Sequence, residues 1–154
     1  MSMTMASVER VSPDAPEAAA LIAKAEAELA LRYPPEHRHG LAVEGLLAQD
    51  ARFFVITHED EAAGCGGYVV FAPGVAELKR MYVARAHRGH GLSRQVLRAI
   101  EGAAAAEGVR VMRLETGTLQ SEALALYLSA GYRVCGKFGT YTESPVSVFM
   151  EKHL

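Results

Sequence analysis

Apolar residues recur at intervals of three and four positions in the first part of the chain. This spacing predicts a helix from about residue 14 to residue 31. Asp14 is followed three residues later by Glu17, which is the spacing of a capping box, so we expect Asp14 to cap the helix. Two prolines then predict a loop, and a short second helix is expected over 41–48.

The rest of the chain alternates β-branched and aromatic segments with turn residues, and two longer helical patterns interrupt them. The predicted strands cover 7–11, 53–57, 64–71, 75–83, 109–114, 132–135 and 146–151, and the predicted helices cover 92–107 and 121–130. Turn chemistry predicts an antiparallel meander over 53–83. Helices inserted among the strands of a largely antiparallel sheet indicate an α/β fold with a mixed sheet.

Composition and charge narrow the class of protein. The chain has 154 residues, the length of one domain, and a net charge of −2, which argues against a strongly basic nucleic-acid binder. It has no run of about 18 apolar residues, so no membrane span is expected. No signal peptide is recognisable, and Cys65 and Cys135 lack the spacing of a disulfide framework or zinc site. We expect a cytoplasmic protein. Both cysteines are expected to be small buried residues, and the alternative is that one of them is the nucleophile that forms an acetyl-enzyme.

A glycine-containing loop joins the strand predicted over 75–83 to the helix predicted over 92–107. The free N–H groups and partial positive charge at a helix start attract anions, and Gly89 and Gly91 allow phosphate to approach the backbone. Three arginines add full charges nearby: Arg85, Arg88 and Arg94. The spacing matches neither a P-loop nor a full G-x-G-x-x-G, which argues against a P-loop kinase or a nicotinamide enzyme. The alternative is that these glycines only form a turn.

Two stretches resemble one family. Glu77 to Val83, followed by Arg88 to Ser93, resembles the GNAT superfamily of acetyl-CoA-dependent N-acetyltransferases. Its cofactor signature is Arg or Gln, two residues, Gly, one residue, then Gly or Ala, and Arg88, Gly91 and Ser93 occupy those places. Residues 120–132 resemble the family's later motif, Asn-x-x-Ala-x-x-Leu-Tyr, with glutamine in place of the usual asparagine.

The resemblance implies a single-domain GNAT-like fold over residues 1–154, with a mixed, mostly antiparallel sheet flanked by helices. Its central strands, 75–83 and 109–114, would run parallel and splay apart, and acetyl-CoA would enter between them as the acetyl donor. No metal is expected. The implied cofactor-binding residues are Met81, Tyr82, Val83, Arg88, Gly89, His90, Gly91, Leu92, Ser93 and Gln120.

Glu77 lies in the middle of a predicted strand, where a carboxylate is poorly suited. Alternation along this strand places both apolar and charged side chains on each face. This pattern favours a strand that lines a functional site, or a bulged strand, over a core strand. An amine substrate with a pKa near ~10 is neutral in only about one molecule in a thousand at pH 7. The resemblance implies a general base on this strand, acting directly or through water. A salt bridge with Lys79 or Arg110 is the alternative, and Glu115 is a second candidate base.

The resemblance also implies a role for Tyr127, which would protonate the departing CoA thiolate. The alternative is an ordinary tyrosine packed in the core.

Histidines cluster in two loops. Residues 37–39 (His-Arg-His), with Tyr33 and Glu36, could bind an anionic or aromatic acceptor or could simply be solvated. His87 and His90 beside the phosphate loop suit either helper contacts or plain exposure. No pair of histidines has the helical spacing of metal ligands, so no metal cluster is expected.

These observations predict acetyl transfer from acetyl-CoA to the primary amine of a small molecule, by direct attack in a ternary complex. No nucleic-acid or membrane partner is expected, and the resemblance leaves a homodimer open. One alternative is a non-catalytic acyl-CoA-binding module, which would need neither Glu77 nor Tyr127. A second alternative is a protein N-acetyltransferase, which would need an open acceptor groove.

Overall fold

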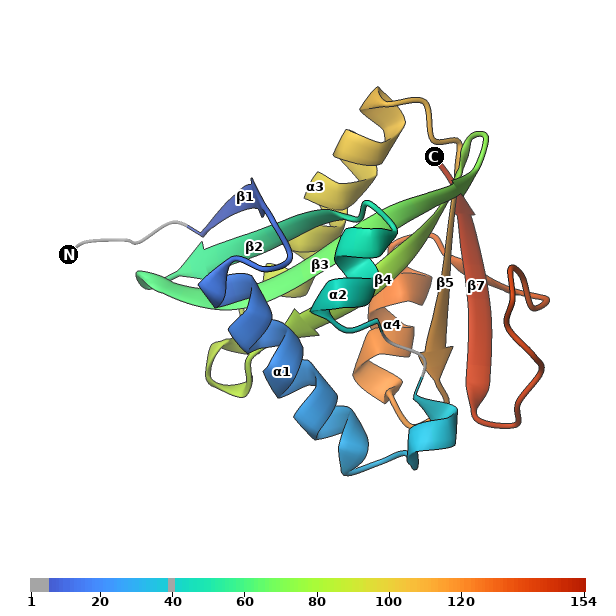
Figure 1. Cartoon of the computed structure of the whole chain (residues 1–154), viewed down its shortest axis with the longest axis horizontal. Helices are drawn as coiled ribbons and strands as arrows, with labels where there is room; N and C mark the ends of the chain where they lie inside the picture. The colour runs from blue at the N-terminus through green and yellow to red at the C-terminus, as the bar shows by residue number, and fades with distance from the viewer. Residues whose placement is uncertain (1–5, 39–40) are drawn as a thin grey trace.

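One twisted sheet organises the computed structural model of the chain, which describes residues 6–38 and 41–154 (Figure 1). Within these ranges the sheet has seven strands in the order β1-β2-β3-β4-β5-β7-β6. The strands are β1 (Ser7–Val11), β2 (Arg52–His58), β3 (Glu61–Ala72), β4 (Val75–Val83), β5 (Val111–Gly117), β6 (Arg133–Cys135) and β7 (Ser147–His153). The helices are α1 (Pro16–Ala30), α2 (Val43–Ala48), α3 (Leu92–Ala106) and α4 (Ser121–Ser129), with short 3₁₀ turns η1 (Pro35–His37) and η2 (Arg85–His87). The predicted α/β fold is confirmed.

The central pair of strands is the parallel one. β4 pairs with β5 at only three positions, Val75 with Val111, Ala76 with Met112 and Glu77 with Arg113. The other neighbouring strands are antiparallel. Beyond Glu77 the two central strands are no longer paired, so they diverge toward their carboxyl ends, and the predicted splay is confirmed.

Helices cover both faces of the sheet. Leu92, Val96, Leu97 and Ile100 of α3 are buried together with Phe54 and Ile56 of β2. On the opposite face α1 and α2 pack against Phe53, Val55 and Cys65, and Figure 1 shows these two helices in front of the sheet. The alternation of Phe53, Phe54, Val55 and Ile56 between the two clusters is the two-residue period of a strand buried on both faces.

The start of α1 differs from the prediction. The position before the helix is Ala15, and no side chain caps it. Asp14 instead accepts a hydrogen bond from the Ser12 hydroxyl. Pro16 explains the difference, because it stands at the first helical position, where its fixed φ starts a helix and its missing N–H needs no cap.

No helix within the described ranges is long and apolar enough to cross a membrane.

Candidate active site

A cleft of about 390 Å³ opens where β4 and β5 part. Four parts of the chain contribute most of its walls, namely the end of β4 (78–83), the loop into α3 (87–93), the end of β5 (114–117) and the start of α4 (119–123). The end of α1, the loop that follows it and Tyr141 close the far side. Ligands of open α/β sheets bind beyond the carboxyl ends of the strands, and this cleft has that position.

A bulge shapes the β4 wall. Cys65 of β3 pairs with Tyr82 and Gly67 pairs with Lys79, so two residues of β4, Arg80 and Met81, lie opposite Gly66 alone. Arg80 takes a left-handed backbone conformation with φ of 56°. Such a bulge interrupts the ladder and leaves backbone groups free for another partner.

The loop before α3 has the backbone of an anion site. Gly91 stands just before the helix with φ of 73°, and Gly89 has φ of 86°. A Cβ built at either glycine meets no atom within 4 Å, so the backbone conformation, and not crowding by the protein, calls for glycine. The first N–H groups of a helix have no partner within the helix, and no side chain caps α3, as a phosphate site requires.

The arginines near this loop all have protein partners. Arg88 donates to the Val83 carbonyl at 2.9 Å and to both oxygens of Glu28 at 2.8 and 3.0 Å. Arg85 lies 3.9 Å from Glu28, and Arg94 donates to the Ser129 hydroxyl at 2.6 Å. Arg88 therefore joins α1 to the loop, and its guanidinium group is already bound to protein groups.

Glu28 is held as a carboxylate by this arrangement. Burial acts to raise its pKa, but hydrogen bonds from Tyr82 and Arg88 outweigh burial and hold the pKa of Glu28 below its usual value. Burial, followed by the bond to Glu28, raises the pKa of Tyr82 to about 12.

The predicted cofactor residues line the cleft with one exception. His90 is not part of the lining, and its ring lies 4.9 Å from that of His58. Gln120 lines the cleft, but its side-chain oxygen accepts the Gly117 N–H at 2.9 Å and so closes the turn from β5 into α4.

Tyr33 holds the same turn in a way that the sequence did not indicate. Its hydroxyl accepts the N–H of Leu119 at 2.9 Å. A Cβ at Gly117 would lie 1.9 Å from that hydroxyl oxygen, so glycine is required there by close approach.

Tyr127 faces the cleft from α4 and is 6% exposed. Its ring packs edge-on against Tyr132, with the ring centroids 5.7 Å apart. Burial raises the pKa of Tyr127, so the phenol keeps its proton at neutral pH. No residue in the described part of the chain hydrogen-bonds to this hydroxyl, which leaves it available to a ligand in the cleft.

Glu77 lies behind the cleft wall and does not line it. Its carboxylate accepts a hydrogen bond from the Tyr141 hydroxyl and pairs with Lys79 Nζ at 2.9 Å. Lys79 also donates to the Tyr141 hydroxyl oxygen at 3.0 Å, and both Lys79 and Tyr141 line the cleft. The salt bridge to Lys79 is therefore formed, and Glu77 reaches the cleft through Tyr141. Sequence reasoning missed Tyr141, because it lies in a loop without a motif.

Two arginines of the cleft lining share one carboxylate. Arg38 and Arg80 share the single carboxylate of Glu26, at 3.1 and 2.7 Å. Arg80 also donates to the Leu41 carbonyl at 2.8 Å, and its side chain is only 5% exposed. Within the described residues, Nη1 of Arg80 and Nε of Arg38 are buried without a hydrogen-bond partner.

The remaining candidates fall in different places. Glu115 and His37 line the cleft, and His37 Nδ1 lies 3.4 Å from the Ser144 hydroxyl, whereas His39 lies outside the described residues.

Cys65 is fully buried, its thiol donates to the Arg80 carbonyl, and burial raises its pKa to about 12. Burial also raises the pKa of Cys135, and neither cysteine lines the cleft. These positions argue against an acetyl-enzyme.

Three features occur together in this structure: a splayed parallel strand pair, a bulge on one of its strands and a glycine loop at a helix start. They suit a class of proteins that bind a long phosphate-bearing ligand between two strands. The chain belongs to the Acetyltransferase (GNAT) family, whose profile matches residues 18–132. It is an acetyltransferase, and acetyl-CoA is the acetyl donor of this family.

Individual proteins support this assignment over the whole chain. A protein of Azospirillum brasilense named "IAA acetyltransferase" is 36% identical over 99% of this chain and 100% of its own length. A crystal structure of a Klebsiella pneumoniae protein described as an acyl-CoA N-acyltransferase has 34% identity and a TM-score of 0.83, covering 97% of this chain and 98% of that one. The PaiA N-acetyltransferase of Thermoplasma acidophilum, solved with coenzyme A, shares the fold at a TM-score of 0.75 with 17% identity, over 98% of this chain and 100% of that one.

Proposed function

We propose that the protein transfers the acetyl group of acetyl-CoA to the primary amine of a small molecule that also carries an anionic group. The observation that carries this proposal is the two-ended cleft where β4 and β5 part. One end presents the free N–H groups at the start of α3, and the other presents the guanidinium groups of Arg38 and Arg80. Attack is direct, in a complex that holds the donor and the acceptor together.

The donor lies along β4. Its pyrophosphate binds the N–H groups of residues 88–93, and its pantetheine follows residues 81–83. The thioester carbonyl lies at the bulge of Arg80 and Met81, where backbone N–H groups that are not used by the ladder polarise it. Because these N–H groups are already oriented, stabilising the developing oxyanion costs no rearrangement.

The amine must lose a proton before it attacks. Tyr141 donates to Glu77, so its oxygen can accept a proton from the amine while its own proton passes to the carboxylate. The positive charge of Lys79, 3.0 Å from the same hydroxyl, disfavours an ammonium beside it and so favours the neutral amine. Glu115 also lines the cleft and is the alternative base.

The thiolate leaves toward Tyr127. The buried phenol keeps its proton at neutral pH and can donate it, or a hydrogen bond, to the departing sulfur. Collapse of the tetrahedral intermediate breaks the C–S bond, the nitrogen loses its second proton, which restores the proton given up by Tyr127, and the acetylated amine and CoA are released.

The positive charges of Arg38 and Arg80 indicate the chemical class of the acceptor. Arg38 and Arg80 share the one carboxylate of Glu26, and within the described residues one guanidinium nitrogen of each is buried without a hydrogen-bond partner. A carboxylate or phosphate on the acceptor would be bound by these guanidinium groups. An amine with a second positive charge, such as a polyamine, would be repelled.

The test is a panel of acceptors in matched pairs, with CoA release as the readout. Each amino acid is paired with the amine that lacks its carboxylate, and polyamines, peptides and IAA, named for the Azospirillum relative, complete the panel. We expect kcat/KM for the carboxylate-bearing member to exceed that of its partner at least tenfold. Equal rates within the pairs would overturn the anionic class, and turnover confined to peptides would favour a protein N-acetyltransferase.

A further inference from the structure

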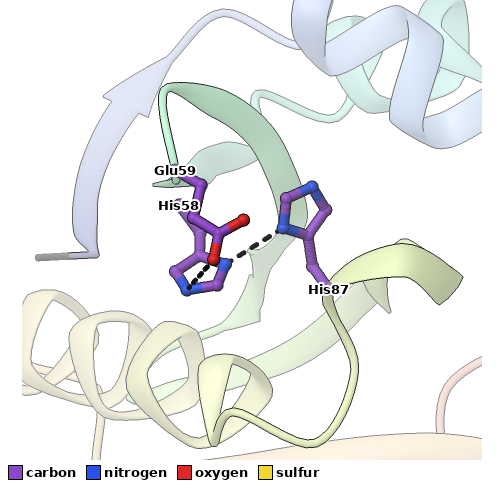
Figure 2. Close-up of side chains that lie close together, drawn as sticks. All are labelled: His58, Glu59 and His87. Carbon is purple, nitrogen blue, oxygen red and sulfur yellow. Dashed lines mark hydrogen bonds and ion pairs between the residues drawn. The ribbon is translucent and has the colours of Figure 1, made fainter. Parts of the chain in front are cut away.

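A cluster of histidines and carboxylates lies at the turn between β2 and β3, opposite η2 (Figure 2). His58 is the last residue of β2, Glu59 begins the turn, and His87 is the last residue of η2, directly before the anion-binding loop. Figure 2 shows the two imidazole rings pointing toward each other with the carboxylate of Glu59 beside His58. The acetyl-transfer mechanism uses none of these side chains.

The two imidazole rings face each other through their Nδ1 atoms. Nδ1 of His58 lies 3.0 Å from Nδ1 of His87, so one of the two rings donates a proton to the other. Nε2 of His87 lies 3.1 Å from a carboxylate oxygen of Glu61. Because that carboxylate takes the Nε2–H of His87, the lone pair of Nδ1 faces His58. His87 is 6% exposed, so its ring has little freedom to turn away.

This arrangement has the features of a transition-metal site. A histidine ligand ordinarily donates its second ring N–H to a carboxylate, as His87 does to Glu61. Two nitrogens bound to one zinc ion at about 2.0–2.1 Å in tetrahedral geometry lie roughly 3.3–3.4 Å apart. The observed 3.0 Å between the two Nδ1 atoms is within a few tenths of an ångström of that spacing.

A third ligand is within reach. One ligand atom from each of His58, Glu59 and His87 can be chosen so that all three lie within 4.8 Å of one another. The Glu59 carboxylate lies 4.0 Å from Nε2 of His58, and its side chain is 68% exposed, which leaves it room to turn toward the two Nδ1 atoms. The ring of His90, 4.9 Å from that of His58, stands beside the cluster, and water or His90 would complete four-coordination.

We propose that His58 and His87 bind a zinc ion through their Nδ1 atoms, with the carboxylate of Glu59 as the third ligand. The ion takes the place of the proton that the two nitrogens share. It links the β2–β3 turn to the segment that leads into the anion-binding loop, so it stabilises that segment. Imidazole and carboxylate ligands suit zinc, and Ni²⁺ and Cu²⁺ would bind the same atoms. This inference does not rest on the proposed acceptor.

The experiment is a zinc titration of the full chain, purified without a histidine tag and stripped of metal. We expect one zinc ion per chain by calorimetry, and a visible absorption band of tetrahedral character when Co²⁺ replaces Zn²⁺. His87→Ala and His58→Gln should each weaken zinc affinity at least tenfold, and Glu59→Gln should weaken it less. His153→Ala is the matched control, because His153 is an exposed histidine at the end of β7, and it should bind zinc like the parent protein.

Stability gives a second readout. Zinc should raise the Tm of the parent protein and of His153→Ala, but not that of His58→Gln, which changes the less buried ring and is the variant to use if His87→Ala does not fold. Absence of zinc binding by the parent protein would overturn the proposal. Equal affinity in the parent protein and in the double variant His58→Gln/His87→Ala would also overturn it, since the ion would then be bound elsewhere.

Discussion

The two ends of the cleft, where we propose that the donor and the acceptor bind, are built in different ways. The donor end is made of backbone, namely the N–H groups of a continuous segment around Gly89 and Gly91. The acceptor end is made of the side chains of Arg38, Lys79 and Tyr141 with Arg80, which come from separate parts of the chain. A backbone site tolerates changes in most side chains but not in local conformation. A side-chain site depends on charges that other residues place and can be changed without altering the fold.

The largest expected effect tests the point where the two ends meet. Tyr127→Phe keeps the ring and its packing on Tyr132 but removes the hydroxyl. A thiolate with a pKa near ~8.5 leaves without full protonation, so we expect kcat to fall by roughly 10–10³-fold, below or within the usual range for a general acid. Steady-state kinetics with the best acceptor measure this, and acetyl-CoA affinity and Tm should stay close to those of the parent protein. A Tyr127→Phe enzyme with unchanged kcat would make Tyr127 a packing residue only.

The next effect separates the acceptor end from the donor end. Glu77→Gln removes the proton acceptor behind Tyr141, so kcat/KM should fall about 10–10²-fold, near the lower edge of general-base effects, and its pH profile should lose an acidic limb. Tyr141→Phe breaks the same relay and should behave alike, while acetyl-CoA affinity changes in neither. If the limb survives in Glu77→Gln but is lost in Glu115→Gln, then Glu115 is the base.

At the donor end, Gly91→Val should weaken acetyl-CoA binding at least tenfold, or about 1.4 kcal/mol. The added side chain would occupy the open space at the start of α3 where phosphate approaches, and φ of 73° disfavours a branched residue. Calorimetry on the folded variant measures the affinity. Gly108→Val is the control, because Gly108 also has positive φ and open space but lies just past the other end of α3. Both variants should lose stability, and equal acetyl-CoA affinity in the two would contradict the anion site.

A smaller effect is expected from changing Arg88, the cationic residue of the family signature. Arg88→Met leaves the backbone of the loop in place but removes the bonds to Glu28 and Val83. We expect the Kd for acetyl-CoA to change less than about threefold, or about 0.7 kcal/mol, while Tm falls. A loss of affinity as large as that of Gly91→Val would mean that the guanidinium itself binds phosphate.

The smallest effect concerns pH and the same contact. The folded pKa of Glu28 is lowered by Tyr82 and Arg88 against the effect of burial, so its carboxylate contributes stability above its ordinary pKa near 4.5. That contribution is lost as the pH falls through the lowered folded pKa. Melting curves between about pH 3 and 7 should show a Tm difference between the parent protein and Glu28→Gln that is full near neutrality and shrinks toward pH 3. A difference that does not change with pH would show that packing, and not charge, stabilises this contact.

Local patterns in the sequence were enough to predict most of the framework and the glycine loop before α3. Helical spacing places α3, alternation places β2 and β4, and these patterns depend only on residues near one another in the chain. Gly89 and Gly91 mark the anion loop because positive φ is a local requirement that glycine meets. The cap predicted for Asp14 was wrong for an equally local reason, since Pro16 starts the helix without it.

Contacts between distant side chains follow from the way the strands and helices pack. The pairing of Glu77 with Tyr141, the sharing of Glu26 by Arg38 and Arg80, and the approach of His58 to His87 each join segments far apart in the chain. Such contacts depend on strand register, and the bulge in β4 adds to it for Arg80, because a shift of one residue turns every following side chain to the other face. Hydrophobic periodicity shows that a strand exists but does not specify its partner or the place where its ladder slips. The contacts that join Arg80, Lys79 and Tyr141 to their partners therefore follow from strand pairing and not from local patterns in the sequence.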